Sequence, residues 1–312
     1  MNVAVLDIGS NTTKILITAK GQNGALQVMA EKSYPCRLAT GLSRDNPVLS
    51  SVMIDSCLQV IAQLVSFAEA FSPVTTRIVA TEALRKLSNS NSLIEKVRNR
   101  FALNIEILSG AREASLIANG LLTDPYLDSI TEFCAIDLGG GSLEIIRVSD
   151  SCCQEVLSLP LGAVVLSENF LDDLSKKPTE TDVHRLQKYI SSTLADHSST
   201  LLKNCSYLVG AGGSIVFLRQ LISSTSHAEL SEESILPYSA IQKITKEINS
   251  LDLSSRIERF PLLPPDRADV FPAALLVILE LLKFCELTSL THSFHNLRYG
   301  VAQEIFDSQG SF

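Results

Sequence analysis

The chain has 312 residues, of which 46% are hydrophobic and 19% are charged. This composition is typical of a globular protein with a large buried core and does not fit a disordered chain, and the length favours two domains. The formal net charge of −8 argues against non-specific nucleic-acid binding, which depends on clustered Lys and Arg side chains, although a local site can still hold an anionic substrate.

The first part of the chain predicts alternating strands and helices. Residues 2–34 predict three strands joined by two turns, the second of them at the sequence GQNGA. Apolar residues at helical spacing predict a helix over residues 53–71, which Pro73 follows. The remaining elements expected here are a strand at 76–81, a helix near 92–101, a strand at 104–108 and a helix over 109–122.

A segment rich in Pro, Asp and Ser, residues 123–131, predicts a boundary. A second strand, glycine turn and strand follow it, then a third strand and helices at about 164–170 and 180–196. Residues 206–221 predict a strand, a glycine loop and a helix, and the remainder predicts mostly helix. The expected domains are residues 1–125 and 126–296, with a C-terminal helix at about 297–312 that packs back on the first domain.

Two segments of the chain repeat one pattern. Asp7 to Thr12 aligns with Asp137 to Ser142, and in both places the acid ends an apolar strand and the turn leads into an alternating strand. Such repetition predicts two halves of like fold. A carboxylate beside a tight, amide-rich turn suits a phosphate chain together with a hard cation such as Mg²⁺.

The alternative for each turn taken alone is an ordinary hairpin. Three successive glycines at 139–141 leave room for a ligand to approach the backbone, and a third loop, GAGGS at 210–214, opens a helix whose N-terminal amides favour anions. The dinucleotide fingerprint G-x-G-x-x-G does not occur, which disfavours a Rossmann dehydrogenase. Phosphate binding is therefore the favoured interpretation.

No segment of the sequence suggests secretion or membrane insertion. The most apolar stretch, Phe271–Phe284, is interrupted by Glu280 and falls short of the roughly 18 apolar residues that a bilayer requires. The N-terminus has no basic region followed by an apolar block. The seven cysteines include no CxxC motif, which favours free thiols in a reducing compartment. We expect a cytoplasmic protein that does not bind membranes.

The motifs DIGSN, SGxxEAxLI, DxGGGSxE and GAGGS together resemble those of the exopolyphosphatase and guanosine pentaphosphate phosphohydrolase (Ppx/GppA) family. The stretches PLGAVVLSE, DRADVFPAAL and LRYG resemble further family segments in the same order. The resemblance implies an α/β fold of the short form, with two ribonuclease H-like domains of the actin, sugar-kinase and Hsp70 superfamily flanking an interdomain cleft.

The resemblance also implies roles for individual residues. Glu113 matches the catalytic glutamate that deprotonates the attacking water, whereas spacing alone favours its interpretation as a first-turn acid that interacts with the helix dipole. Asp137 and Glu144 match the acids that hold Mg²⁺, with Mn²⁺ as an alternative ion. The expected phosphate-binding residues are Asp7, Gly9, Ser10, Asn11, Arg85, Gly139, Gly140, Gly141, Ser142, Gly212, Gly213 and Ser214.

The implied activity is the removal of terminal phosphate from polyphosphate or from guanosine pentaphosphate (pppGpp) by water. Two alternatives stay open: a nucleotide-dependent kinase or ATPase of the same superfamily, and a non-catalytic sensor of a phosphorylated signal. The intact acids Glu113, Asp137 and Glu144 disfavour the sensor. The expected partner is the polyphosphate or guanosine polyphosphate substrate, without nucleic acid or membrane, and a homodimer through the apolar C-terminal helices is expected by analogy.

Overall fold

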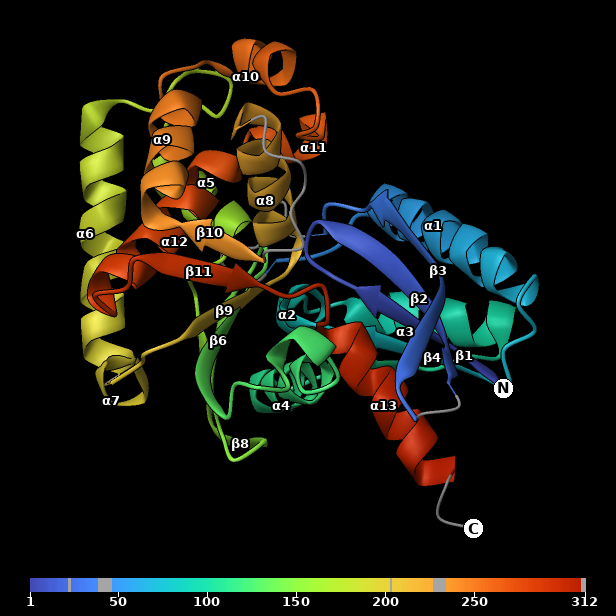
Figure 1. The fold of residues 1–312 in the computed structure, drawn as a ribbon. Coiled ribbons are helices and arrows are strands. Elements are labelled where there is room, and N and C mark those ends of the chain that lie inside the picture. The colour runs from blue at the N-terminus through green and yellow to red at the C-terminus, as the bar shows by residue number, and fades with distance from the viewer. Residues whose placement is uncertain (22–23, 39–46, 203, 227–233, 310–312) are drawn as a thin grey trace. The chain divides into compact units, whose positions relative to one another are not determined.

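The computed structural model describes residues 1–21, 24–38, 47–202, 204–226 and 234–309. The chain forms two compact units: unit 1 comprises Met1–Asp128 and His295–Phe312, and unit 2 comprises Ser129–Phe294. Each unit contains one mixed β-sheet with helices packed on it (Figure 1). The predicted α/β class is therefore confirmed.

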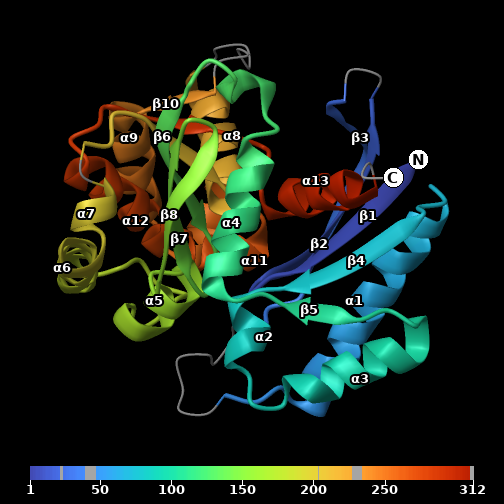
Figure 2. The ribbon, with the colours of Figure 1, turned by 90° about the horizontal axis from the view of Figure 1, so that it is seen from below.

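Unit 1 is built on a five-stranded sheet of order β3-β2-β1-β4-β5. The first three strands are antiparallel, whereas β4 and β5 run parallel to β1. Figure 2 shows α1 and α3 on one face of the sheet and α4 and α13 on the other. The elements are β1 (Asn2–Ile8), β2 (Thr12–Lys20), β3 (Leu26–Pro35), α1 (Ser51–Glu69), β4 (Thr75–Ala80), α2 (Glu82–Lys86), α3 (Ser90–Phe101), β5 (Ile105–Ile107), α4 (Gly110–Leu121), η1 (Pro125–Leu127) and α13 (Leu297–Gln309).

Unit 2 is built on a six-stranded sheet of order β10-β11-β9-β6-β7-β8. Strands β6, β7 and β8 are antiparallel, whereas β9 and β11 run parallel to β6. The elements are β6 (Glu132–Leu138), β7 (Leu143–Ser149), β8 (Cys152–Leu159), α5 (Ala163–Phe170), α6 (Glu180–His197), α7 (Ser199–Leu202), β9 (Leu208–Ala211), α8 (Gly213–Ser226), β10 (Ile235–Pro237), α9 (Tyr238–Asn249), α10 (Leu253–Arg259), α11 (Pro265–Ala268), α12 (Phe271–Phe284) and β11 (Ser289–His292).

The two sheets share one strand order. In unit 2 the order β8-β7-β6-β9-β11 corresponds to β3-β2-β1-β4-β5 of unit 1, and β10 extends the second sheet by one edge strand. This is the order of the ribonuclease H-like fold, so the predicted repetition is found. The prediction of mostly helix after residue 221 is confirmed for the described residues, but it missed β10 and β11, which are three and four residues long and owe their form to their neighbours in the sheet. Residues 22–23 of the predicted GQNGA turn lie outside the described residues.

Helices α4 and α13 pack in unusually close contact within unit 1. A Cβ atom on Gly300 of α13 would lie 1.7 Å from the carbonyl oxygen of Leu116 on α4, and one on Gly120 of α4 would lie 2.1 Å from the carbonyl oxygen of Asn296. Only glycine permits such backbone contact. The stretch LRYG therefore fixes the position of α4.

Helix α1 is long and apolar enough to cross a membrane by length and composition alone, with a mean hydropathy of 1.5. The sequence-based prediction that no segment is long enough to span a bilayer is wrong for α1. Its buried residues recur at helical spacing, as at Ile54, Leu58 and Ile61, and α1 contacts β2 and α3 within unit 1. A core helix of a soluble protein passes the same test, so the length of α1 is a weak indication of a membrane span.

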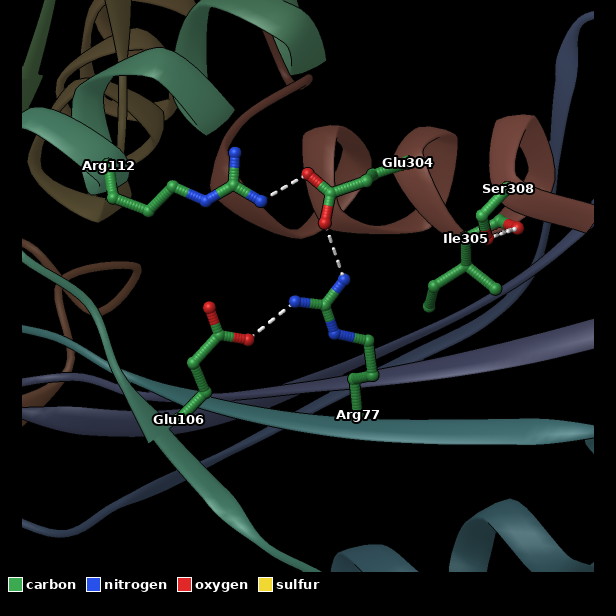
Figure 3. A network of polar contacts seen from close by, with 6 residues as sticks. All are labelled: Arg77, Glu106, Arg112, Glu304, Ile305 and Ser308. Carbon is green, nitrogen blue, oxygen red and sulfur yellow. Dashed lines mark hydrogen bonds and ion pairs between the residues drawn. The ribbon is translucent and has the colours of Figure 1, made fainter.

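A network of ion pairs links four elements of unit 1 (Figure 3). Glu304 of α13 accepts a hydrogen bond from Arg77 of β4 at 2.8 Å and another from Arg112 of α4, and Arg77 also pairs with Glu106 of β5. Burial raises the pKa of the Glu304 carboxyl, but hydrogen bonds from Arg77 and Arg112 outweigh it, so the net pKa is lowered from 4.5. Arg298 bonds to the carbonyl oxygen of Ile15 and pairs with Glu31.

The Glu304 network predicts a pH-dependent contribution to stability. Because the pKa is lower in the folded state, the contribution is present above the unfolded pKa near 4.5 and is lost as the pH falls through the folded pKa. The Glu304 side chain is 33% exposed, so solvent screening limits the effect of Glu304→Gln to about 1 kcal/mol in the free energy of unfolding at pH 7. Urea unfolding at neutral and acidic pH measures it, with Glu69→Gln on exposed α1 surface as the matched control. If Glu304→Gln and wild type differed equally in the free energy of unfolding at both pH values, the pH-dependent contribution of Glu304 would be contradicted.

Candidate active site

Three candidate segments of unit 1 follow the carboxyl ends of three neighbouring parallel strands. Asp7 lies near the end of β1 and Gly9 follows it, Arg85 lies on α2 after β4, and Glu113 lies on α4 after β5. The carboxyl edge of parallel strands is where open α/β sheets bind ligands. The fold thus brings sequence-distant candidates to one edge of one sheet.

The loop after β1 is a tight turn. The Gly9 N–H donates to the Thr12 carbonyl at 3.1 Å, and a Cβ on Gly9 would lie 3.0 Å from the same oxygen. Ser10 and Asn11 are buried in the turn. The Asn11 carbonyl accepts from the backbone N–H groups of residues 36 and 37, both at 2.9 Å, which anchors the turn to the chain after β3.

Asp7 carries a buried carboxylate oxygen, Oδ1, for which the described part of the chain offers no hydrogen-bond partner. Burial raises the pKa of Asp7, while the charges of Lys14 and Arg298 act in the opposite direction. Lys14 lies directly opposite Asp7 in the β1–β2 pairing. A buried polar atom without a partner is costly, so Oδ1 is suited to meet a ligand, water or cation.

Glu113 and Arg85 contact each other within unit 1. Glu113 is buried in the first turn of α4, which Ser109 caps by accepting from the backbone N–H of Arg112 at 3.2 Å. Arg85 donates to Glu113 Oε2 at 3.3 Å and to the carbonyl oxygen of Leu108. The guanidinium therefore holds this carboxylate in a fixed orientation, while the Arg85 side chain keeps 28% of its surface exposed.

The glycine turn after β6 is held by the start of α5. The Gly139 N–H donates to the Ser142 carbonyl at 3.0 Å, and the Gly139 and Gly140 carbonyls accept from the N-terminal N–H groups of α5. A Cβ on Gly162 would lie only 2.2 Å from the carbonyl carbon of Gly141. Gly162 thus allows the glycine turn to pack against the start of α5. The sequence analysis did not single out this residue, and the only indication of it was its place in the PLGAVVLSE stretch.

The third glycine loop lies against Asp137. Asp137 of β6 pairs in register with Ala211 of β9, directly before Gly212. Gly212 has a positive φ of 90°, and a Cβ there would lie 2.2 Å from Asp137 Oδ1. Gly213 and the buried Ser214 then begin α8. Unit 2 therefore brings DLGGGS and GAGGS together at the carboxyl edge of β6 and β9.

Gly212→Ala is expected to destabilise unit 2 more than backbone strain alone explains. The matched control is Gly24→Ala, because Gly24 also has a positive φ, 84°, but a Cβ there meets nothing within 4 Å. Both variants carry the left-handed strain of about 1–2 kcal/mol, and Gly212→Ala adds overpacking against Asp137 of about 1–3 kcal/mol. Urea unfolding of each variant measures the difference. Equal losses in the free energy of unfolding in Gly212→Ala and Gly24→Ala would show that the Asp137 side chain accommodates the added methyl group without cost.

Asp137 and Glu144 form a directly opposed pair on β6 and β7, so their side chains share one face of the sheet. Glu144 is buried and its Oε1 accepts from Ser158 of β8 at 2.8 Å, a supporting contact that sequence reasoning also missed. Among the described residues, no group of three or more His, Cys, Asp or Glu side chains is arranged to hold a metal. Two carboxylates fit Mg²⁺, which usually keeps several waters and substrate phosphates as its other ligands.

Comparison with known proteins identifies the family. The model of the Ppx/GppA phosphatase family matches residues 16–309. The chain belongs to the Ppx/GppA phosphatase family. The first loop, which contains Asp7 and Gly9, precedes the matched segment.

Relatives and solved structures within the Ppx/GppA family are distant in sequence but close in fold. The guanosine-5'-triphosphate,3'-diphosphate pyrophosphatase of Vibrio parahaemolyticus is 26% identical over 97% of this chain, which spans 59% of the length of that relative. The crystal structure of the Aquifex aeolicus family member is 26% identical, with a TM-score of 0.83 over 100% of this chain and 99% of the other. An exopolyphosphatase from Cytophaga hutchinsonii is 21% identical, has a TM-score of 0.89 over 99% of this chain and 98% of its own, and supports the fold alone.

Proposed function

We propose that the chain is a phosphohydrolase that removes a terminal phosphate from polyphosphate or from pppGpp. The observation that carries the proposal is the match to the phosphatase family over residues 16–309. The pyrophosphatase relative named above supports a guanosine polyphosphate substrate, although the chain spans only 59% of its length. Both substrates end in the same phosphoanhydride, so one set of residues serves either.

In the proposed reaction, water attacks the terminal phosphoanhydride, and residues of the chain orient the water and hold the phosphate. Glu113 accepts a proton from the attacking water, and Arg85 orients the Glu113 carboxylate through the 3.3 Å contact. The turns at Gly9–Asn11, Gly139–Ser142 and Gly212–Ser214, together with Asp7 and Arg85, hold the phosphate oxygens through backbone amides and side chains. This positioning is the main requirement of phosphoryl transfer to water.

Asp137 and Glu144 would hold Mg²⁺, with Mn²⁺ as an alternative ion. The space that Gly212 leaves beside Asp137 Oδ1 and the buried, Ser158-supported Glu144 fit such an ion. The ion would offset the negative charge of the phosphate oxygens. The chain's own residues fix the two carboxylates on one face of the sheet.

A phosphate-release assay tests the proposed activity. The purified chain is incubated with Mg²⁺ and, separately, with long polyphosphate, with pppGpp or with ATP and sugars. Release from polyphosphate or pppGpp is the expected result and also decides between these substrates. Phosphate transfer from ATP to a sugar would contradict the proposal in favour of a kinase, and binding without release at every Mg²⁺ concentration would contradict it in favour of a sensor.

Asp137→Asn tests the metal part of the proposal. Removing one carboxylate charge is expected to raise the Mg²⁺ concentration for half-maximal phosphate release by about 10–100-fold or more. Asp150→Asn is the matched control, because Asp150 is an exposed turn residue of the same unit. Calorimetric titration of Mg²⁺ provides a readout without turnover. An unchanged Mg²⁺ requirement in Asp137→Asn would remove this residue from the metal site.

The proposal also places the protein in the cytoplasm. All seven cysteines are free, which supports a reducing compartment.

A homodimer through the C-terminal helices stays a prediction. Helix α12 is buried within unit 2 over most of its length, so such a contact would use α13 or another surface. Light scattering on the purified chain measures the oligomeric state.

A further inference from the structure

Helices α4 and α13 of unit 1 contact each other at regular intervals. Gly120 of α4 lies against the carbonyl of Asn296, directly before α13, and Gly300 of α13 lies against the carbonyl of Leu116. A step of one turn forward along α13 is therefore a step of one turn back along α4, so the two helices run antiparallel. Because residues one turn apart share a face of a helix, the same register continues to the next turn of each helix.

The next pair in this register is Arg112 and Glu304, whose side chains form an ion pair (Figure 3). Arg112 lies in the first turn of α4, directly before Glu113. The first turn of a helix has backbone N–H groups without partners inside the helix and frays easily. In α4 the Ser109 cap and the Arg112–Glu304 pair both hold this turn. The ion pair thus lies at the turn of α4 that carries the candidate base.

Glu304 connects this turn to the sheet of unit 1 as well as to α13. One carboxylate oxygen, Oε2, pairs with Arg112, and the other, Oε1, accepts from Arg77 of β4 at 2.8 Å. Glu106 of β5 pairs with the same Arg77 guanidinium. We name the contacts from Arg112 through Glu304 to Arg77 the Glu304 bridge. Since α2 follows β4 and α4 follows β5, the bridge ties the first turn of α4 to the strands that lead into the candidate site.

Glu113 is thereby held by two separate sets of contacts. Arg85 donates to its carboxylate at 3.3 Å and to the Leu108 carbonyl shortly before α4, which orients the side chain. The Glu304 bridge holds the backbone of the same turn from the side of α13. The Arg112 and Glu304 side chains are 40% and 33% exposed, so their ion pair adds little to the overall stability. The location of the pair, rather than its strength, therefore points to a role in positioning.

We propose that Glu304 is a positioning residue that acts on Glu113 through Arg112. The proposal rests on the proposed function, because it takes Glu113 as the group that accepts the proton of the attacking water. No step of that reaction uses Glu304 itself. The Glu304 bridge keeps the first turn of α4 in one place, so that the Glu113 carboxylate meets the water in the geometry that proton transfer requires. A small displacement of such a group lowers the rate steeply.

Glu304→Ala and Arg112→Ala test the proposal in the full chain. Each is expected to lower the single-turnover rate of phosphate release by about 10-fold, while the substrate concentration for half-maximal rate changes by less than about 2-fold. Hydrogen exchange followed by mass spectrometry is expected to be about 5-fold faster at the backbone N–H groups of residues 113–116. The control is Asp55→Ala, which removes the Lys96–Asp55 pair between α1 and α3 on the other face of the sheet (Figure 2) and is expected to change neither quantity.

The Glu113→Gln background shows whether Glu304 acts through Glu113. In that background Glu304→Ala is expected to change the remaining rate by less than about 2-fold, because the group that the bridge positions no longer accepts a proton. Three results would overturn the proposal: unchanged exchange at residues 113–116, an unchanged rate in both single variants, or an equal loss of rate with and without Glu113→Gln. If wild type released no phosphate, the proposed function would fail, and the exchange result alone would decide whether the Glu304 bridge fixes this turn.

Discussion

Glu113→Gln is expected to lower the rate of phosphate release by about 10²–10⁴-fold while substrate binding is retained, because the amide has almost the same shape but cannot accept the proton of the attacking water. The side chain is buried, and Arg85 orients it at 3.3 Å, so a neutral amide stays in place. Single-turnover rates together with equilibrium binding of the substrate separate the two effects.

The control for Glu113→Gln is the same substitution at Glu95, an exposed residue of α3 in unit 1, which is expected to leave the rate unchanged. Near wild-type turnover in Glu113→Gln would show that another group accepts the proton. Loss of binding with an unchanged rate in the bound complex would instead make Glu113 a substrate-holding residue.

Gly300→Ala is expected to lower the free energy of unfolding of unit 1 by about 1–3 kcal/mol or more, because the added methyl group overlaps the backbone of α4. Its Cβ would lie 1.7 Å from the Leu116 carbonyl oxygen, a backbone atom that cannot rotate away. Helix α4 must therefore shift, and Glu113 shifts with it, so phosphate release is expected to fall as well. Urea unfolding and the release assay measure both effects.

Ser308→Ala on the same helix is the control for Gly300→Ala. Ser308 is exposed and its hydroxyl donates to the Ile305 carbonyl of its own helix at 2.8 Å (Figure 3), so a change within about 0.5 kcal/mol is expected. Equal stability of Gly300→Ala and wild type would mean that α13 moves away from α4 without loss.

Strands followed by glycine turns could be predicted from the sequence because their signals are local. The run before Asp7 and the one before Asp137 are apolar on both faces and end at glycine, and both became central strands, β1 and β6. Strand β11 could not be predicted, since its four residues show no hydrophobic periodicity. They are extended only because β9 and β10 flank them in the sheet.

The candidate site was accessible from the sequence as a set of motifs but not as a set of contacts. Glycines and acids at fixed spacing suggested the loops, and the family resemblance suggested Glu113 and Arg85. That Arg85 touches Glu113, or that Gly212 abuts Asp137, depends on strands adjacent in space but distant in sequence. Gly162 and Ser158 support the site from outside the glycine and acid motifs; Gly162 lies in the PLGAVVLSE stretch, whereas the sequence does not indicate the contact of Ser158 with Glu144.

The division of unit 1 between the two ends of the chain has a consequence for biosynthesis. Residues Ser129–Phe294 form unit 2 without interruption, whereas unit 1 needs His295–Phe312 in addition to Met1–Asp128. During translation the second unit is therefore complete while the first still lacks α13, although the first was begun earlier. Until Gly300 leaves the ribosome, the face of α4 around Leu116 lacks the helix that packs on it, so the nascent unit 1 stays incomplete after unit 2 has been synthesised.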